Sequence, residues 1–299
     1  MKTNVTFPSN GLSLAGHLYT PGTPSAGPAP AVVVGHPAMG VKEQTAAVYA
    51  ERLAARGFVA LTFDAAYQGE SEGEPHGLEN PFQRADDFRN AVSYLATRDD
   101  VAAERIGVLG ICSAGGYAPF AAQTDHRMKA VATISAMDLA GFFKSGDPAG
   151  FATMVETAGR RRSEEAAGET PALVGVLPEL DQIDASTPEL VRESVDYYKT
   201  PRGGHPRATG LWVARSADQL DQFDAYAQVD KIAPRPFLMI AGTEAATRPF
   251  SAHAVAKAGR TAELFDIEGA THVDLYDKDE YVTQAVAKLS EFFGAHLAA

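Results

Sequence analysis

The chain has a single cysteine, and this cysteine lies where a strand pattern breaks into a helix pattern. Residues 105–116 read RIGVLGICSAGG. A nucleophile on such a strand–turn–helix junction needs small residues two positions before it and two after it, because the two backbones come close there. Gly110 and Ala114 meet this need around Cys112, whereas a turn centred on Ser113 would be flanked by a bulky isoleucine. The pattern therefore favours a thiol nucleophile at Cys112 over a cysteine that only fills the core.

A second candidate turn, GESEG at residues 69–73, matches G-x-S-x-G literally but lacks the required setting. Four residues separate it from the preceding apolar run at 58–64, and Pro75 follows too closely for a helix to start from the turn. We therefore expect Ser71 to lie in a polar loop.

A thiol nucleophile needs a base, and His272 has the right position for one. It lies in the glycine-containing segment EGATHVD, between an apolar run at 262–267 and the last helical pattern. An imidazole there would take the thiol proton and later protonate the leaving group. The imidazolium of His272 and a helix N-terminus at Ser113 would both favour the Cys112 thiolate. His36 is expected to be structural.

The developing oxyanion needs two backbone N–H donors. One is the amide of Ser113, directly after the candidate nucleophile. The other should come from the loop GHPAMG at residues 35–40. Because Pro37 has no N–H, Ala38 or Met39 must donate, and we favour Ala38.

Composition restricts the partners. The chain is 299 residues long and 45% hydrophobic, and its net charge of −12 argues against nucleic acid and anionic membranes as partners. One cysteine excludes an internal disulfide, and neither a signal sequence nor an apolar run approaching the roughly 20 residues of a membrane span is visible. We expect a cytoplasmic protein that acts on a small-molecule substrate. The sequence contains no metal-ligand spacing and leaves the oligomeric state open, a homodimer included.

Apolar runs alternate with helical patterns along most of the chain, which indicates a largely parallel sheet covered by helices on both faces. The expected strands are 4–7, 12–19, 31–34, 58–63, 106–111, 130–135, 237–240 and 262–267, and the expected helices are 43–56, 81–97, 114–122 and 280–297. The first two strands should form a hairpin that turns at Asn10 and Gly11. Asn80 should cap the second helix.

The stretch from 139 to 233 breaks this alternation and contains only short helical patterns. A connection of this length should have structure of its own. We expect a helical cap over the carboxyl edge of the sheet, inserted into a core of residues 1–138 and 234–299. A second domain that binds a partner is the alternative. The candidate substrate contacts of the cap are Tyr197, Tyr198, Arg202, His205 and Trp212, and packing of Trp212 inside the cap is an equal alternative.

Five segments together resemble the dienelactone-hydrolase-related α/β hydrolases, in their YcjY-like branch. They are HPAMGVKEQT, GESEG with ENPFQRADDFRNAV, RIGVLGICSAGGY, YYKTPRGGHPR and GATHVDLYDK. The resemblance spans nearly the whole chain. It implies the α/β-hydrolase fold, with a mostly parallel central sheet and a helical cap inserted between strands 6 and 7. It also implies a Cys (or Ser)–Asp–His hydrolase that uses no cofactor.

The chain departs from the family pattern where the triad acid should stand. The family pattern resembles A-G-S-E-A-D-T, whereas residues 241–247 read AGTEAAT and place Ala246 at the acid position. Asp138 at the end of strand 6 is slightly favoured as a substitute, because a strand end is better fixed than a loop. Glu244 is the other carboxylate in reach. A Cys–His dyad without an acid is the third reading, since a thiol tolerates loss of the acid better than a hydroxyl does.

These residues predict a hydrolase that cleaves an ester, lactone or thioester through an acyl-enzyme on Cys112. Two other functions remain open on the same residues. One is a non-hydrolytic acyl transferase or cyclase on this scaffold. The other is a cap-gated ligand-binding protein that has lost hydrolysis.

Overall fold

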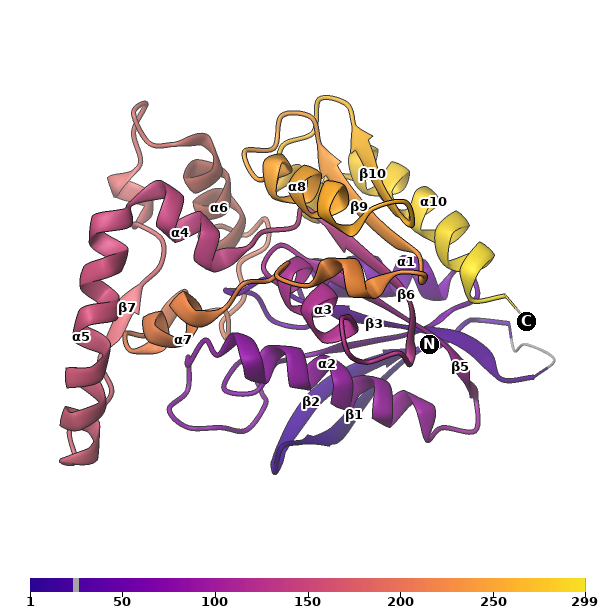
Figure 1. Ribbon diagram of the computed structural model, residues 1–299, viewed down its shortest axis with the longest axis horizontal. Helices are drawn as coiled ribbons and strands as arrows, with labels where there is room; N and C mark the ends of the chain where they lie inside the picture. The colour runs from indigo at the N-terminus through magenta and orange to yellow at the C-terminus, as the bar shows by residue number, and fades with distance from the viewer. Residues whose placement is uncertain (24–26, 299) are drawn as a thin grey trace.

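A twisted sheet forms the centre of the molecule in the computed structural model, which describes residues 1–23 and 27–298. Among these residues the sheet has eight strands (Figure 1). In spatial order they are β1 (Lys2–Ser9), β2 (Leu12–Tyr19), β4 (Val59–Phe63), β3 (Ala29–Gly35), β5 (Val101–Ile111), β6 (Met128–Ile134), β9 (Phe237–Gly242) and β10 (Ala262–Ile267). Strand β2 runs antiparallel to β1 and β4, and all other neighbours are parallel. The parallel strands from β4 to β9 are buried on both faces, which explains their continuous apolar runs.

Helices cover both faces of the sheet, as the alternation of patterns predicted. One apolar core lies under α1 (Thr45–Ala54) and α10 (Asp279–His296). The other lies under α2 (Pro81–Ala96), α3 (Ala114–Ala122) and α8 (Arg248–Ala258). Asn80 caps α2 as expected, because its side chain accepts hydrogen bonds from the amides of Phe82 and Gln83 at 3.1 and 3.2 Å. The predicted α/β architecture is confirmed, and the predicted element boundaries differ from the observed ones mainly at β5. This strand begins at Val101, which pairs with Ala29 at the start of β3.

The chain leaves the sheet after β6 and returns before β9, and we call residues 139–233 the inserted segment. It contains α4 (Leu139–Gly146), α5 (Pro148–Ala166), β7 (Leu173–Gly175), η1 (Leu180–Gln182), α6 (Glu189–Lys199), β8 (Leu211–Val213), α7 (Ser216–Gln222) and η2 (Val229–Ile232). Figure 1 shows most of it gathered on one side of the sheet. The sequence analysis anticipated helices here but missed the small antiparallel sheet of β7 and β8, whose strands are only three residues long.

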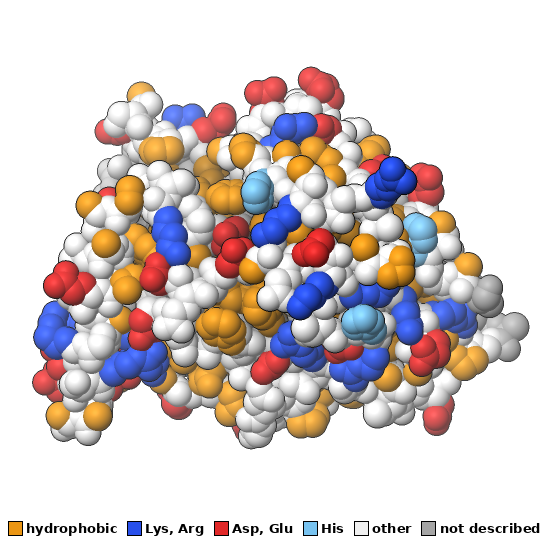
Figure 2. Space-filling model, in the orientation of Figure 1, with side chains coloured by type: hydrophobic (Ala, Val, Ile, Leu, Met, Phe, Trp, Pro, Cys, Tyr) orange, Lys and Arg blue, Asp and Glu red, His pale blue; other side chains and the backbone are white. Residues whose placement is uncertain are grey.

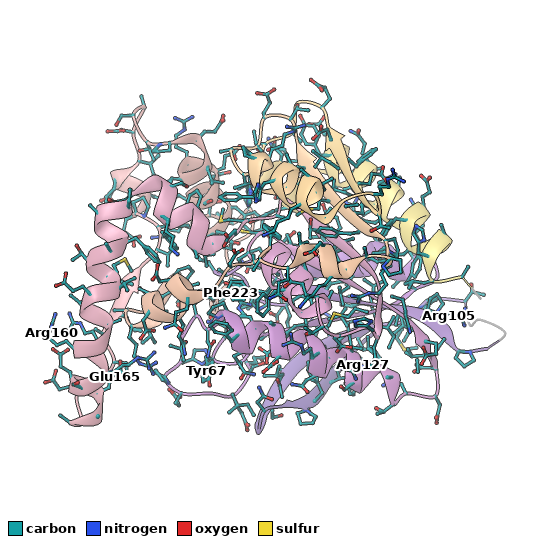
Figure 3. The ribbon with its side chains drawn as sticks, in the orientation of Figure 1. Tyr67, Arg105, Arg127, Arg160, Glu165 and Phe223 are labelled. Carbon is teal, nitrogen blue, oxygen red and sulfur yellow. The ribbon has the colours of Figure 1, made fainter. Side chains whose placement is uncertain are left out.

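Two arginines fasten the inserted segment to the rest of the molecule. The Arg202 guanidinium donates to both oxygens of Asp277, at 3.0 and 2.6 Å. Arg207 donates to Glu43 at 2.6 Å and lies 3.2 Å from Glu70. An aromatic junction forms where the segment returns to the core. There the ring of Phe223 packs against those of Tyr117 and Phe120 (Figure 3).

The surface mixes both signs of charge despite the net charge of −12. Figure 2 shows Lys and Arg side chains interspersed with Asp and Glu over one face. Along the described part of the chain, no helix combines the length and apolarity needed to cross a bilayer. Within residues 1–23 and 27–298, no three His, Cys, Asp or Glu side chains are grouped so that they could hold a metal ion.

Candidate active site

The turn between β5 and α3 is centred on Cys112. This residue has a left-handed backbone, with φ at 57°, whereas Ser113 already has helical angles. Its amide donates to the carbonyl of Ile134 at 3.0 Å, which ties the turn to the end of β6. A Cβ atom at position 110 would lie 2.0 Å from the backbone oxygen of Ala114, so only glycine fits there. The close approach assumed in the sequence analysis is therefore present.

Ser113 is fully buried, and its hydroxyl has no hydrogen-bond partner among the described residues. Its backbone amide faces the thiol of Cys112. The structure thus places the Cys112 side chain, and not that of Ser113, on the side of the turn that faces the cavity.

Cys112 opens onto a small cavity of about 100 Å³ between the sheet and the inserted segment. Most of its lining is apolar: Pro37, Ala38, Met39, Met137, Leu139, Phe142, Phe143, Val176, Leu177, Leu190, Val191 and Trp212. The remaining lining residues are Cys112, Ser194, Tyr198, His272 and Tyr276. None of the described residues in this lining is an aspartate, glutamate, lysine or arginine.

His272 lies in this cavity, as the sequence analysis expected, and three contacts fix it. The Ser135 hydroxyl donates to its backbone oxygen at 2.9 Å. The Nδ1 atom is 2.6 Å from the Thr247 hydroxyl oxygen, and Nε2 is 3.1 Å from the hydroxyl oxygen of Tyr276. Burial lowers the pKa of His272 to about 3, because a charged imidazolium would lose its hydration. The imidazole is therefore neutral near neutral pH.

Neither carboxylate considered in the sequence analysis contacts this imidazole. Asp138 directly precedes α4, and its buried Oδ1 atom has no hydrogen-bond partner among the described residues. Glu244 and Ala246 are exposed. The expectation of a carboxylate partner is corrected: a threonine hydroxyl takes that place, one residue beyond the position that the family pattern indicates.

Tyr276 was not anticipated from the sequence. It follows His272 by four residues, in the short helix α9 (Asp274–Asp277), and this spacing brings its hydroxyl back to the imidazole. Its hydroxyl also lies against the thiol of Cys112. The spacing in THVDLY was the available signal, but an apolar contact between two core residues would have the same spacing.

The protonation of Cys112 is opposite to the expectation. Burial raises the pKa of the thiol to about 11, and the Tyr276 hydroxyl and the Ser113 amide offset this only in part. The helix N-terminus and His272 were expected to favour the thiolate. Since His272 is uncharged, it supplies no positive charge, and desolvation dominates.

The loop after β3 supplies candidate oxyanion donors. Ala38 and Met39 line the cavity beside Cys112, and their amides donate to no other group among the described residues. The loop is held from behind by His36, whose Nδ1 lies 2.7 Å from the Pro37 oxygen. The Nε2 atom of His36 accepts from the amide of Ala65 at 3.1 Å. Burial holds the pKa of His36 well below its usual range, so this histidine is neutral and structural, as expected.

Two of the five candidate substrate contacts reach the cavity: Tyr198 and Trp212. Tyr197 lies behind Tyr198, with ring centroids 5.0 Å apart. Arg202 is occupied by Asp277, and His205 accepts from the amide of Arg207 at 3.3 Å. Within the described residues, Tyr197, Arg202 and His205 are absent from the lining. For them the expectation is corrected, because they hold the inserted segment together.

The GESEG loop has the structural role that its setting predicted. The Ser71 hydroxyl is buried, donates to the Asp64 oxygen at 2.6 Å and accepts from the Ala15 amide at 2.9 Å. Glu70 and Asp64 both pair with the buried ammonium of Lys42, at 2.6 and 2.7 Å. These contacts hold the loop in a fixed position against the core.

Comparisons with known proteins agree with this architecture. The Dienelactone hydrolase family matches residues 14–137. The uncharacterized protein YcjY of Escherichia coli K12 is 38% identical over 88% of this chain and 87% of its own length. The solved structure of the hypothetical protein PA2218 from Pseudomonas aeruginosa has a TM-score of 0.92 and 35% identity, and the match covers 99% of this chain and 94% of that one.

A more distant relative carries the name of an activity. Thiohydrolase aneE of Aspergillus aculeatus is 28% identical over 59% of this chain and 54% of its own length. The sheet topology, the turn at Cys112 and the relatives of high identity and coverage lead to one assignment. The chain belongs to the dienelactone-hydrolase-related α/β hydrolases, in the branch that contains YcjY and PA2218.

Proposed function

We propose that the protein hydrolyses an ester, lactone or thioester through an acyl-enzyme on Cys112, with His272 as the base. One observation carries the proposal. A cysteine on a left-handed turn and a neutral histidine open onto the same apolar cavity, beside the amides of Ala38 and Met39, which have no partner among the described residues. This is the arrangement that acyl transfer to a nucleophile requires.

The reaction would proceed in two halves. His272 Nε2 accepts the thiol proton, and the Cys112 sulfur attacks the carbonyl carbon. The carbonyl electron pair moves onto oxygen, which the amides of Ser113 and of Ala38 or Met39 stabilise. Collapse of this intermediate breaks the bond to the leaving group, which takes the proton from His272. Water, deprotonated by His272, then attacks the acyl carbon and releases the acid and the thiol.

The inserted segment would act as the cap of this site. Phe142, Phe143 and Trp212 cover the cavity from this side and exclude water. The absence of a carboxylate beside His272 fits a thiol nucleophile, which needs less help from its base than a hydroxyl does. The relative aneE is named a thiohydrolase, which supports a thioester among the candidate substrates.

The acyl-enzyme is the first expected result. Brief exposure to activated esters and thioesters should add one acyl group to the protein, and peptide mass spectrometry should locate it on Cys112. Cys112→Ala should abolish the adduct, and Ser113→Ala should retain it. An adduct that survives Cys112→Ala but not Ser113→Ala would contradict the proposal. An adduct that water leaves intact and an added alcohol removes would contradict hydrolysis and indicate acyl transfer.

Thr247 should matter more than either carboxylate. Thr247→Val keeps the shape of the side chain but removes the hydroxyl that orients Nδ1, so we expect the acylation rate to fall about tenfold. Asp138→Asn and Glu244→Gln serve as controls and should change it less than about twofold. Stopped-flow acylation of the three variants makes the comparison. A large loss in Asp138→Asn with none in Thr247→Val would show that the resting contact at His272 is not the one used in catalysis.

The acyl group should be uncharged. No described residue in the cavity lining is a lysine or an arginine, His272 is uncharged near neutral pH, and burying an ion without an opposite charge costs several kcal/mol. We expect kcat/KM for a hemisuccinyl ester to be at least about a hundredfold below that of the butyryl ester of the same alcohol. The common leaving group is the internal control. Equal values for the two esters would show that the acyl group does not enter this cavity.

A further inference from the structure

The hydroxyl of Tyr276 lies between the two groups that the proposed reaction must connect. It is 3.1 Å from His272 Nε2 and lies against the thiol of Cys112. All three side chains line the same cavity, and all three are at least nine-tenths buried. Among the hydrogen bonds of the described residues, none joins Cys112 directly to His272. Tyr276 is therefore the residue that contacts both the thiol and the imidazole.

The hydrogen bonds around His272 allow only certain proton positions. When Nδ1 donates its hydrogen to the Thr247 hydroxyl, Nε2 has a free lone pair and accepts the hydrogen of the Tyr276 hydroxyl. The tyrosine oxygen then has lone pairs left for the thiol hydrogen. A phenol hydroxyl can donate one hydrogen bond and accept another at the same time, so the Tyr276 hydroxyl can connect the thiol to the imidazole.

We propose that Tyr276 is a catalytic residue that relays the thiol proton to His272. As the S–H bond of Cys112 breaks, its electron pair stays on sulfur and its proton passes to the tyrosine oxygen. The tyrosine's own hydroxyl proton moves to Nε2 in the same step. The products are a thiolate, a neutral Tyr276 and an imidazolium. No other reactant is needed, and the reverse path returns a proton to the Cys112 sulfur once the acyl group has been released.

The contacts around Tyr276 hold its side chain in one position. A proton relay requires this, whereas a side chain that only blocks access to the thiol would be free to move. Its backbone oxygen accepts from the Thr45 hydroxyl at 3.1 Å, and the adjacent Leu275 oxygen accepts from the Tyr49 hydroxyl at 2.7 Å. Its ring packs edge-on against Tyr197, with centroids 5.1 Å apart. Burial raises the pKa of Tyr276 well above its usual range, so the hydroxyl does not lose its proton permanently.

This inference rests on the proposed function, but alkylation of Cys112 tests it without an ester substrate. Iodoacetamide consumes the thiolate and develops no oxyanion, so its rate near neutral pH reports proton removal from the thiol alone. We expect Tyr276→Phe and His272→Ala each to lower this rate about tenfold. The double variant should be no slower than His272→Ala, because the two residues act in one path.

The matched control is Tyr281→Phe. Its hydroxyl lies 3.4 Å from the Gly269 oxygen, outside the cavity, and the rate should not change. Thermal unfolding of Tyr276→Phe checks that the ring still packs. If Tyr276→Phe does not fold, the relay is tested on the wild type instead. The acylation rate is then measured as the deuterium fraction of the solvent is increased. A curved dependence supports two protons in motion, and a linear one overturns the relay.

Three results would overturn the relay. Alkylation of Tyr276→Phe at the wild-type rate or faster would indicate that Tyr276 only blocks access to the thiol. A loss of ester acylation with unchanged alkylation would indicate an oxyanion donor. If Tyr276→Phe lowers the alkylation rate by the same factor in the His272→Ala background, Tyr276 stabilises the thiolate directly. The proposed hydrolase function is judged separately, because an acyl-enzyme on Cys112 can form whichever of these holds.

Discussion

Burial of Cys112 and His272 sets the protonation state of both candidate reacting groups. Burial raises the pKa of the thiol to about 11 and lowers that of His272 to about 3. The resting pair is therefore a neutral thiol and a neutral imidazole, not a thiolate–imidazolium pair. In such a site the charged pair forms only when a substrate is present to accept the negative charge, and the oxyanion donors become the main source of stabilisation. The apolar lining of the same cavity is the basis for the expectation of an uncharged acyl group.

The fold provides this environment by bringing together parts of the chain that are far apart in sequence. The end of β5 places Cys112, the loop after β3 places the free amides, and the loop after β10 places His272. The inserted segment closes the cavity with Phe142, Phe143 and Trp212. Its arginine pairs with Asp277 and Glu43 hold it against the core. A substitution that breaks these distant ion pairs would therefore change the solvation of the Cys112 thiol.

The sequence predicted the features that depend on local sterics. The small residues Gly110 and Ala114 fixed the turn on Cys112, and the loop position of His272 followed from the order of strands and helices. The partners of the imidazole depend on how the loops after β9 and β10 meet, and no local pattern encodes that contact. Thr247 was missed for this reason. Tyr276 lies only four residues after His272 and was missed because an apolar contact between two core residues would have the same spacing. The thiol pKa was misjudged because the helix N-terminus is visible in the sequence, whereas the apolar side chains that the segment 139–233 places beside Cys112 are not.

The proposed mechanism starts from an uncharged Cys112 thiol, and this state can be tested directly. The single cysteine allows a clean measurement, because ¹³C labelling of cysteine gives one Cβ resonance whose chemical shift follows ionisation of Cys112. We expect this resonance to titrate at about 11, above the value of about 8.5 for a free thiol. A midpoint below that of a free thiol would show a resting thiolate and contradict the account.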